Sequence, residues 1–498
     1  MNRHAMRVAA ALAIAACLFW RLGHAESDRP ITLGQTIERA VLGNADLRRE
    51  RLAVVRAMAG ETQALGQFDL LLGSNLSLQS LSSCMTVDCL ALVPSKPIPA
   101  GSLTLSRNLE SGGKLLLSAG MTRWPPGLFA ATDAGKEAPA YDSSLTLTFT
   151  HPLLRGLGTE IAQANLRKAR IQADMAQLAR QMRACNVVRD VVVSYWELAY
   201  ATQDLAIRRS ALELGQEQLH ATQAMIAAGR LADADAASVE RAIAERREDV
   251  ASAEQSLLFR SLDLWRLLGQ PPDARAARLS ATDAPSGRAP VLDDAGEVEQ
   301  ALSANPQLRA LRAGIALSQV DLATARSTLF PKLDFTGSVG PAGRRSTLGG
   351  SLGQLGQFGA VNWLAGLSFE MPVQNRAARG DMRMAEEAFQ RANLDAEDFA
   401  LQVRDLVLRA ASNIRTTGVR VELGHREVRF AEQNLEAEKA RFQAGRATNN
   451  DVLLRQHELK DAETRLLRAS IDQEESEAAL AAVTAEILER YGVVLKGL

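Results

Sequence analysis

The segment Ile226–Asp235, IAAGRLADAD, is followed 216 positions later by Phe442–Asp451, FQAGRATNND. In each segment a glycine, Gly229 or Gly445, interrupts a long stretch with an apolar residue at every seventh position. A seven-residue apolar repeat held over several heptads indicates a coiled coil, and glycine supplies the positive φ that ends a helix. We therefore expect two helical hairpins. Their heptad residues include Val191, Leu198, Leu205, Leu212, Leu219 and Ile226, then Val407, Ile414, Val421, Val428, Leu435 and Phe442.

The distribution of proline sets the length of these hairpins. No proline occurs in residues 153–270 or 373–498, and proline inside a helix costs about 3 kcal/mol. We expect the helical hairpins to occupy residues 159–269 and 379–491. A polar linker over residues 270–292 follows the first hairpin, and a further helix is expected over residues 297–330.

Two segments between the helices, residues 69–151 and 332–371, contain alternating apolar and polar residues, as in LTLTFT at Leu145–Thr150. Alternation with a period of two predicts strands, with a hairpin between Arg107 and Met121 around Glu110–Gly113. A small isolated sheet is marginal in water. We expect these strands to close with those of other subunits into a transmembrane β-barrel, which leaves no exposed edge. The fold class is thus mainly α with a β-barrel portion. The chain is expected to contain an internal two-fold repeat, residues 26–292 and 293–498.

The first 25 residues have the features of an export signal. A basic start precedes the apolar run Val8–Trp20, and Ala25 is a suitable cleavage residue. Cys17 leaves a lipoprotein, acylated at that residue, as the alternative. In an exported protein Cys84 and Cys89, which share one loop, are expected to form a small disulfide.

Composition and motifs exclude several function classes. The net charge of −1 provides no basic excess for nucleic acid. The six histidines are scattered, and we find neither a phosphate-binding glycine loop nor a metal-ligand spacing. We therefore expect no catalysis, no metal and no cofactor. Beyond the leader no stretch is apolar and long enough for a transmembrane helix.

In these features the chain resembles the TolC family of outer-membrane channel proteins. The resemblance implies a homotrimer in the outer membrane of a Gram-negative bacterium. Three chains would share one β-barrel surrounded by outer-membrane lipid and extend it as an α-helical barrel across the periplasm. A periplasmic adaptor protein and an inner-membrane transporter of RND or ABC type would complete the system. The resemblance is carried by two similar helical segments that precede the strands, Ile37–Leu47 and Val298–Leu308, which lie 261 positions apart. It is also carried by residues 152–156 and 372–373, and by the pairs Gly229/Asp235 and Gly445/Asp451.

The resemblance also gives the two glycine turns a role. Asn449, Asn450 and Asp451 would surround the periplasmic entrance in three copies, where like charges attract cations and discourage anions. Helix capping is the alternative explanation for glycine and aspartate at these positions. Leu454 stands where family members commonly carry a second carboxylate, so a double acidic ring is not expected. The residues expected to contact the adaptor are Ala228, Gly229, Arg230, Asp235, Ala444, Gly445 and Arg446.

The expected function is passive conduction of substrates from an inner-membrane transporter across the periplasm and outer membrane, in multidrug or metal efflux. Type I protein secretion is the alternative within the channel class. A periplasmic coiled-coil adaptor or a scaffold protein is the alternative from another class. The two hairpins together with the alternating strands favour the channel.

Overall fold

The computed structural model describes residues 29–80, 82–84, 92–94, 97–125, 131–133, 136–138, 140–272, 277–287 and 290–495. They form two compact units, each assembled from separate stretches of the chain. Unit 1 takes residues up to 52, 178–309 and from 397 onward, and unit 2 takes residues 53–177 and 310–396. The expected leader with Cys17 lies outside the described residues, as do Cys89 and the side chain of Cys84.

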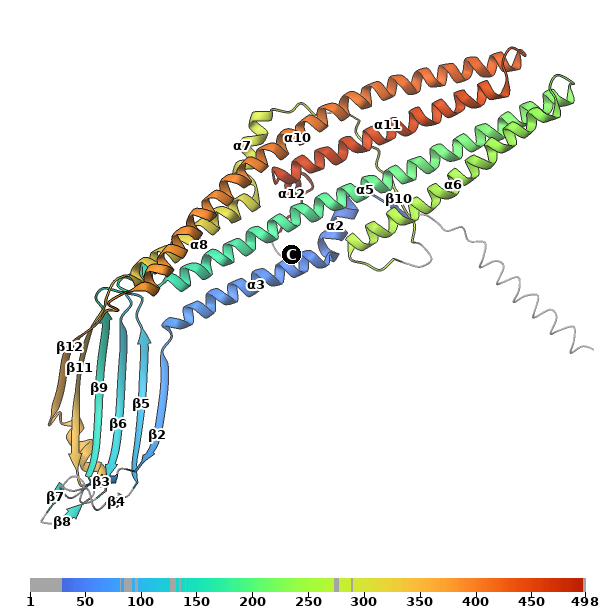
Figure 1. Cartoon of the computed structure of the whole chain (residues 1–498). Coiled ribbons are helices and arrows are strands. Elements are labelled where there is room, and N and C mark those ends of the chain that lie inside the picture. The colour runs from blue at the N-terminus through green and yellow to red at the C-terminus, as the bar shows by residue number, and fades with distance from the viewer. Residues whose placement is uncertain are drawn as a thin grey trace, which may run out of the picture. The chain divides into compact units, whose positions relative to one another are not determined.

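Unit 1 is mainly helical (Figure 1). The hairpins that the heptads predict are present, and their outgoing helices α5 and α10 contain 64 and 68 residues. The helices of unit 1 are α2 (Leu33–Gly43), α6 (Asp233–Leu268), α7 (Asp294–Ala304), α11 (Asn449–Val483) and α12 (Ile487–Arg490). Helices α3 (Ala45–Leu65), α5 (Ala164–Ala227), α8 (Pro306–Thr328) and α10 (Arg376–Gln443) supply residues to both units.

The core of unit 1 contains the predicted heptad residues Val191, Leu198 and Leu205 of α5, together with Leu257 of α6. Tyr195 is fully buried among them, and its hydroxyl donates to the Asp283 carboxylate over 2.7 Å. Burial raises the pKa of Tyr195 to about 12, so this donor keeps its proton. The contact holds the linker beside the N-terminal segment, where β1 (Arg29–Ile31) pairs in parallel with β10 (Leu279–Ala281).

The prediction of one continuous helix over residues 297–330 is wrong, because this segment forms two helices, α7 and α8, that are separated at Asn305. Asn305 Oδ1 accepts from the backbone of Gln307 over 3.0 Å, and Pro306 lacks the N–H that a continuous helix needs. Asn44 separates α2 from α3 with the same pattern, accepting from the backbone of Asp46 over 2.9 Å. The two halves of the chain therefore cap these short helices alike.

Unit 2 contains a six-stranded antiparallel sheet in the order β12-β11-β9-β6-β5-β2 (Figure 1). Its strands are β2 (Leu71–Gln79), β5 (Ile98–Asn108), β6 (Lys114–Trp124), β9 (Ala140–Pro152), β11 (Lys332–Arg345) and β12 (Val361–Glu370). Short pairs β3 (Ser82–Cys84) with β4 (Leu92–Pro94), and β7 (Ala131–Asp133) with β8 (Lys136–Ala138), lie in the connections. The hairpin expected between Arg107 and Met121 is confirmed as β5–β6.

The strand register gives the sheet one apolar and one polar face, because successive residues of a strand point to opposite faces. On the apolar face one row of cross-strand neighbours spans all six strands, and we call it the apolar row. Its members are Leu72, Leu105, Leu117, Leu147, Val339 and Trp363. The adjacent row on the polar face includes Gly73, Thr104, Ser118 and Thr146. Five of the six members of the apolar row are exposed.

Two short helices were not foreseen. Helix α9 (Leu348–Gly356) forms within the glycine-rich stretch after β11 and packs on β11 and β9. Gly343 permits this contact, since a Cβ there would stand 2.1 Å from the carbonyl oxygen of Ser351. Helix α4 (Thr159–Ala162) occupies the expected start of the first long helix, which the structure begins at Ala164.

Candidate functional site

The turn between α5 and α6 is capped by its own residues. Gly229 has a φ of +71°, and the amide of Arg230 donates to the Met225 carbonyl over 2.9 Å, which ends α5. Asp235 accepts from the backbone of Ala232 over 3.1 Å at the start of α6. Ala228, Gly229 and Arg230 are exposed, whereas Asp235 is half-buried. The backbone of the first turn and the side chain of Arg230 are thus accessible to solvent.

The turn between α10 and α11 has the same construction. Gly445 has a φ of +73°, and the amide of Arg446 donates to the Arg441 carbonyl over 2.9 Å. Asp451 accepts from the backbone and hydroxyl of Thr448 over 2.9 Å and 2.7 Å. These hydrogen bonds lower the pKa of Asp451, which is exposed and therefore ionised at neutral pH. Ala444, Gly445, Arg446 and Asn450 are exposed as well.

Asn449 has a different environment from its neighbours, because it is buried between the two hairpins. Its Oδ1 accepts from Nε2 of Gln218 and from the hydroxyl of Thr222, both over 2.8 Å. Gln218 and Thr222 belong to α5 and are buried too. We call these three residues the tip contact. It joins the start of α11 to α5, and in this conformation Asn449 does not face water.

A second polar contact lies one heptad further along α11. Gln456 is buried; its Oε1 accepts from Arg246 of α6 over 2.9 Å and its Nε2 donates to the Leu214 carbonyl of α5. Burial lowers the pKa of Arg246. Gly215 leaves space for this guanidinium, since a Cβ there would stand 2.6 Å from Nη1 of Arg246. The two hairpins therefore meet through polar groups as well as through heptad leucines.

Asn449 and Gln456 belong to a polar heptad of α11 that the sequence analysis did not identify. It runs beside the apolar heptad of α11, and its members are buried or half-buried. The sequence does contain polar residues at a constant spacing of seven in this helix, but a helix face exposed to solvent has the same pattern. Burial separates the two interpretations. The residues are Asn449, Gln456, Glu463, Ser470 and Glu477.

Further along unit 1, Arg468 of α11 joins charged groups from three helices. It lies 2.6 Å from Glu197 of α5 and from Asp472, and 3.3 Å from Glu475. Arg420 of α10 pairs with Asp472 over 2.9 Å. Burial raises the pKa of Glu475 to about 7 despite the nearby guanidinium of Arg468. This carboxylate therefore changes charge near neutral pH.

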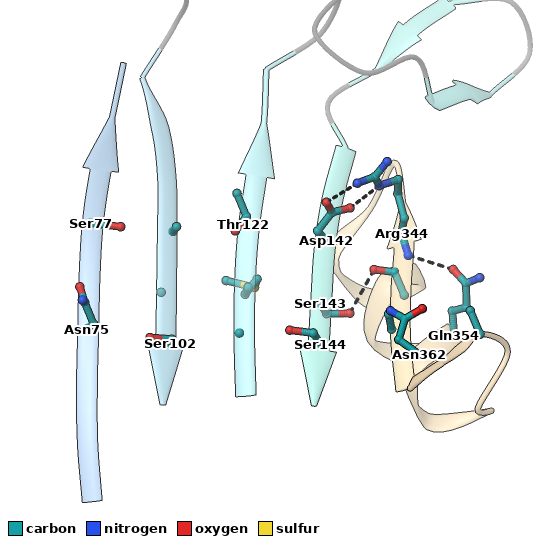
Figure 2. A pocket seen from close by; sticks show the side chains of 17 residues that line it. Asn75, Ser77, Ser102, Thr122, Asp142, Ser143, Ser144, Arg344, Gln354 and Asn362 are labelled. Carbon is teal, nitrogen blue, oxygen red and sulfur yellow. Dashed lines mark hydrogen bonds and ion pairs between the residues drawn. The ribbon is translucent and has the colours of Figure 1, made fainter. Parts of the chain in front are cut away.

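A cavity of about 580 Å³ lies over the polar face of the sheet. Figure 2 shows Asp142 of β9 paired with Arg344 of β11, with bonds of 2.5 Å and 2.6 Å. Trp124 donates to the same carboxylate over 2.8 Å, and the backbone N–H of Arg344 donates to Gln354. The lining is hydroxyl- and amide-rich, as expected of a surface in contact with water.

No helix among the described residues combines the length and the apolar character needed to cross a membrane. Within the same part of the chain, no group of three or more His, Cys, Asp or Glu side chains is arranged to hold a metal ion.

Long helical hairpins combined with an open antiparallel sheet of one polar and one apolar face define a class of outer-membrane channel subunits. The chain belongs to the outer membrane efflux protein family, whose sequence model matches residues 114–270 and 298–486. The resemblance to TolC-family channels is thereby confirmed. The protein is located in the outer membrane and extends into the periplasm.

Similar proteins agree with this assignment. A solved structure of CusC matches with a TM-score of 0.66 and 16% identity, over 91% of each chain. Nodulation protein T of Rhizobium leguminosarum bv. trifolii is 24% identical over 62% of this chain. The pyoverdine export outer membrane protein OpmQ of Pseudomonas aeruginosa is 24% identical over 44% of it. These matches span 64% and 45% of the two relatives' own lengths. The fold is that of an α-helical tunnel joined to a β-barrel, a channel fold rather than an enzyme fold.

Proposed function

We propose that three copies of this chain form one outer-membrane channel of a tripartite efflux system. The single observation that carries the proposal is the sheet of unit 2. Its edge strands β2 and β12 each have only one neighbour among the described strands. Unpaired edges with exposed apolar side chains are unfavourable in a lone subunit, and closure with other copies satisfies them.

Exposed apolar residues on α10 support contact between copies. Within unit 1, Leu401, Leu408, Leu423 and Phe430 have exposed fractions of 64%, 49%, 55% and 60%. They form two pairs with a spacing of seven, Leu401 with Leu408 and Leu423 with Phe430, which is the spacing of a coiled-coil seam. A neighbouring copy in a helical barrel would cover them.

At the periplasmic entrance we propose a ring made by Asp451 and Asn450 of the three copies. Both side chains are exposed, and Asp451 is ionised. Three like charges around one axis attract cations and discourage anions. Asn449 is left out of this ring because its side chain serves the tip contact.

The two turns are the proposed docking site for a periplasmic adaptor, which in turn binds an inner-membrane transporter. Their exposed glycines, flanked by Ala228, Arg230, Ala444 and Arg446, leave the backbone accessible to a partner. Reversing the charge of Arg230 and Arg446 to glutamate tests this role. We expect loss of adaptor co-purification from cross-linked membranes with normal trimer levels. Unchanged co-purification would contradict docking at the turns.

Opening of the channel separates the hairpins near their turns. The tip contact and the Gln456–Arg246 bond join one hairpin to the other and have to break in this movement. Polar contacts suit such a junction, because water can replace each hydrogen bond once the hairpins part.

The proposed substrates are small molecules, since the family model is one of efflux proteins and one relative is named for pyoverdine export. A deletion strain tests this choice. We expect greater sensitivity to at least one drug or metal, restored by the intact chain. A strain that loses only a secreted protein would instead assign the channel to type I protein secretion.

A further inference from the structure

The sheet of unit 2 is divided unequally between the two halves of the chain. Residues 71–152 contribute four of its strands and residues 332–370 contribute two. We infer that the barrel formed by three copies has eighteen strands, closed by β12 of each copy against β2 of the next. The inference rests on the proposed homotrimer and adds the strand number, the closing pair and the width of the channel.

The direction of the edge strands permits this closure. All five neighbouring pairs in the sheet are antiparallel, so β2 and β12 at the ends of a six-stranded order also run in opposite directions. Placing β12 of one copy beside β2 of the next therefore creates another antiparallel pair. Outer-membrane barrels built entirely from antiparallel strands need an even strand number, which three sheets of six strands supply.

The apolar face and the polar face of the sheet both extend from β2, β5 and β6 over β9, β11 and β12. The apolar row continues without interruption from Leu72 on β2 to Trp363 on β12. An outward apolar surface is needed only by strands that face lipid, and a hairpin lying over the sheet or outside the membrane would not need it. The first four strands are therefore part of the barrel wall.

The turn between β5 and β6 packs closely against the end of β9 and the segment that follows it. A Cβ on Gly112 would stand 2.9 Å from the Gly156 carbonyl oxygen, and one on Gly113 would stand 2.9 Å from Nδ1 of His151. Gln163 also donates to Glu110 of this turn over 3.0 Å. These contacts fix the β5–β6 hairpin at the same level as the end of β9.

The family model does not cover the additional strands. Its first match begins at residue 114, the start of β6, whereas its second match begins at residue 298, ahead of both β11 and β12. Strands β2 and β5 thus lie before the matched residues. A barrel built only from β6, β9, β11 and β12 would have twelve strands in three copies and would close β12 against β6.

The strand number sets the width of the channel. Eighteen strands spaced about 4.8 Å apart and tilted by about 40° form a ring about 36 Å across, against about 24 Å for twelve strands. Barrels of 16–18 strands enclose an aqueous channel. The polar face, with its cavity beside Asp142 and Arg344, would line that channel.

Cysteine cross-linking distinguishes the two closures in the full-length protein. The background replaces Cys84 and Cys89 with serine and Cys185 with alanine. Leu76→Cys on β2 is combined in turn with Trp363→Cys, Ala365→Cys, Leu367→Cys or Phe369→Cys on β12, all on the apolar face. The scan is needed because barrel closure staggers the register by an amount that one sheet does not give. Leu117→Cys on β6 is combined with the same four positions.

We expect Leu76→Cys to form oxidant-dependent disulfides between copies, seen as linked dimers and trimers, when it is combined with one or two adjacent cysteine positions of β12. Leu117→Cys should form no such disulfides with any of the four β12 positions. Leu364→Cys, on the opposite face of β12, is the matched control for Leu76→Cys and should not link. Cross-linking through Leu117→Cys would overturn the eighteen-strand barrel in favour of twelve strands. A heat-resistant trimer without cross-links in either series would also overturn it. Absence of any trimer would instead reject the proposed function.

Discussion

Asn449 of α11 and Gln218 of α5 are hydrogen-bonded over 2.8 Å in a buried position between the two hairpins. Thr222 donates to the same Asn449 oxygen, so one side chain satisfies two donors of the other hairpin. In the sequence Asn449 is one of three adjacent polar residues after a glycine turn, and nothing separates it from Asn450 and Asp451. The fold separates them, and their expected effects on the channel differ accordingly.

Asn449→Ala should weaken the closed state. It leaves Nε2 of Gln218 buried without its acceptor, a penalty of about 1–3 kcal/mol in the closed conformation, whereas the Thr222 hydroxyl can still donate to the Gln218 carbonyl over 2.8 Å. We expect a higher open probability in planar-bilayer recordings. Asn450→Ala, one residue along on the exposed side, is the matched control and should leave gating unchanged. Equal gating in the two variants would argue against the tip contact.

Asp451→Asn should lower cation preference, because it removes the charge proposed to ring the entrance while keeping an oxygen that can accept from Thr448. The reversal potential in a salt gradient measures this preference directly. Asp235→Asn at the first turn is the comparison, since Asp235 has the same capping role but is half-buried. An unchanged reversal potential in Asp451→Asn would contradict the entrance ring.

Glu475→Gln should stabilise the protein at alkaline pH. Burial raises the pKa of Glu475 from 4.5 to about 7 in the folded protein, so folding favours its protonated form. The stability associated with this group is complete below pH 4.5 and is lost as pH rises toward 7. We expect the variant to melt a few degrees above the parent at pH 8 and together with it near pH 4.5. The helical circular dichroism signal provides the melting curve.

The exposed carboxylate Glu248 on α6 supplies the control for this comparison. Glu248→Gln should leave the melting temperature unchanged at both pH values. A stabilisation by Glu475→Gln that is the same at pH 4.5 and pH 8 would show that repacking, and not the charge of Glu475, is responsible.

Gly43→Ala should destabilise unit 1. A Cβ on Gly43 would stand 2.1 Å from the Leu268 carbonyl oxygen, where α2 meets the end of α6. Gly34→Ala in the same helix meets no atom within 4 Å and should stabilise the helix by up to about 1 kcal/mol. We expect thermal melting curves to show a lower melting temperature for Gly43→Ala and a higher one for Gly34→Ala than for the parent protein. Two similar melting temperatures would show that α2 can move away from α6.

The sequence predicted the hairpins well because a heptad repeat and two glycine turns are local patterns with one common structural solution. Val191, Val407 and Ile414 are buried as their spacing indicates. The burial of Asn449 was not predictable, since it depends on Gln218 and Thr222, more than 220 positions away. Capping by Asp235 and Asp451 was recognised as a possibility and is observed.

The sheet was predicted less completely. Alternation identified its strands and the β5–β6 hairpin, but the pairing partners of a strand are set by long-range contacts that alternation does not encode. The glycine-rich stretch concealed α9, whose sequence LGGSLGQLG has a low intrinsic preference for helix. Its contact with β11 and β9 provides the stability that the local sequence lacks.

The central claim is that three copies of this chain build one closed channel in the outer membrane. A cryo-electron microscopy reconstruction of the protein extracted from outer membranes measures this most directly. We predict a particle with three-fold symmetry and a single barrel to which each copy contributes β2, β5, β6, β9, β11 and β12. A monomer, or a particle in which each copy forms a separate barrel, would contradict the account.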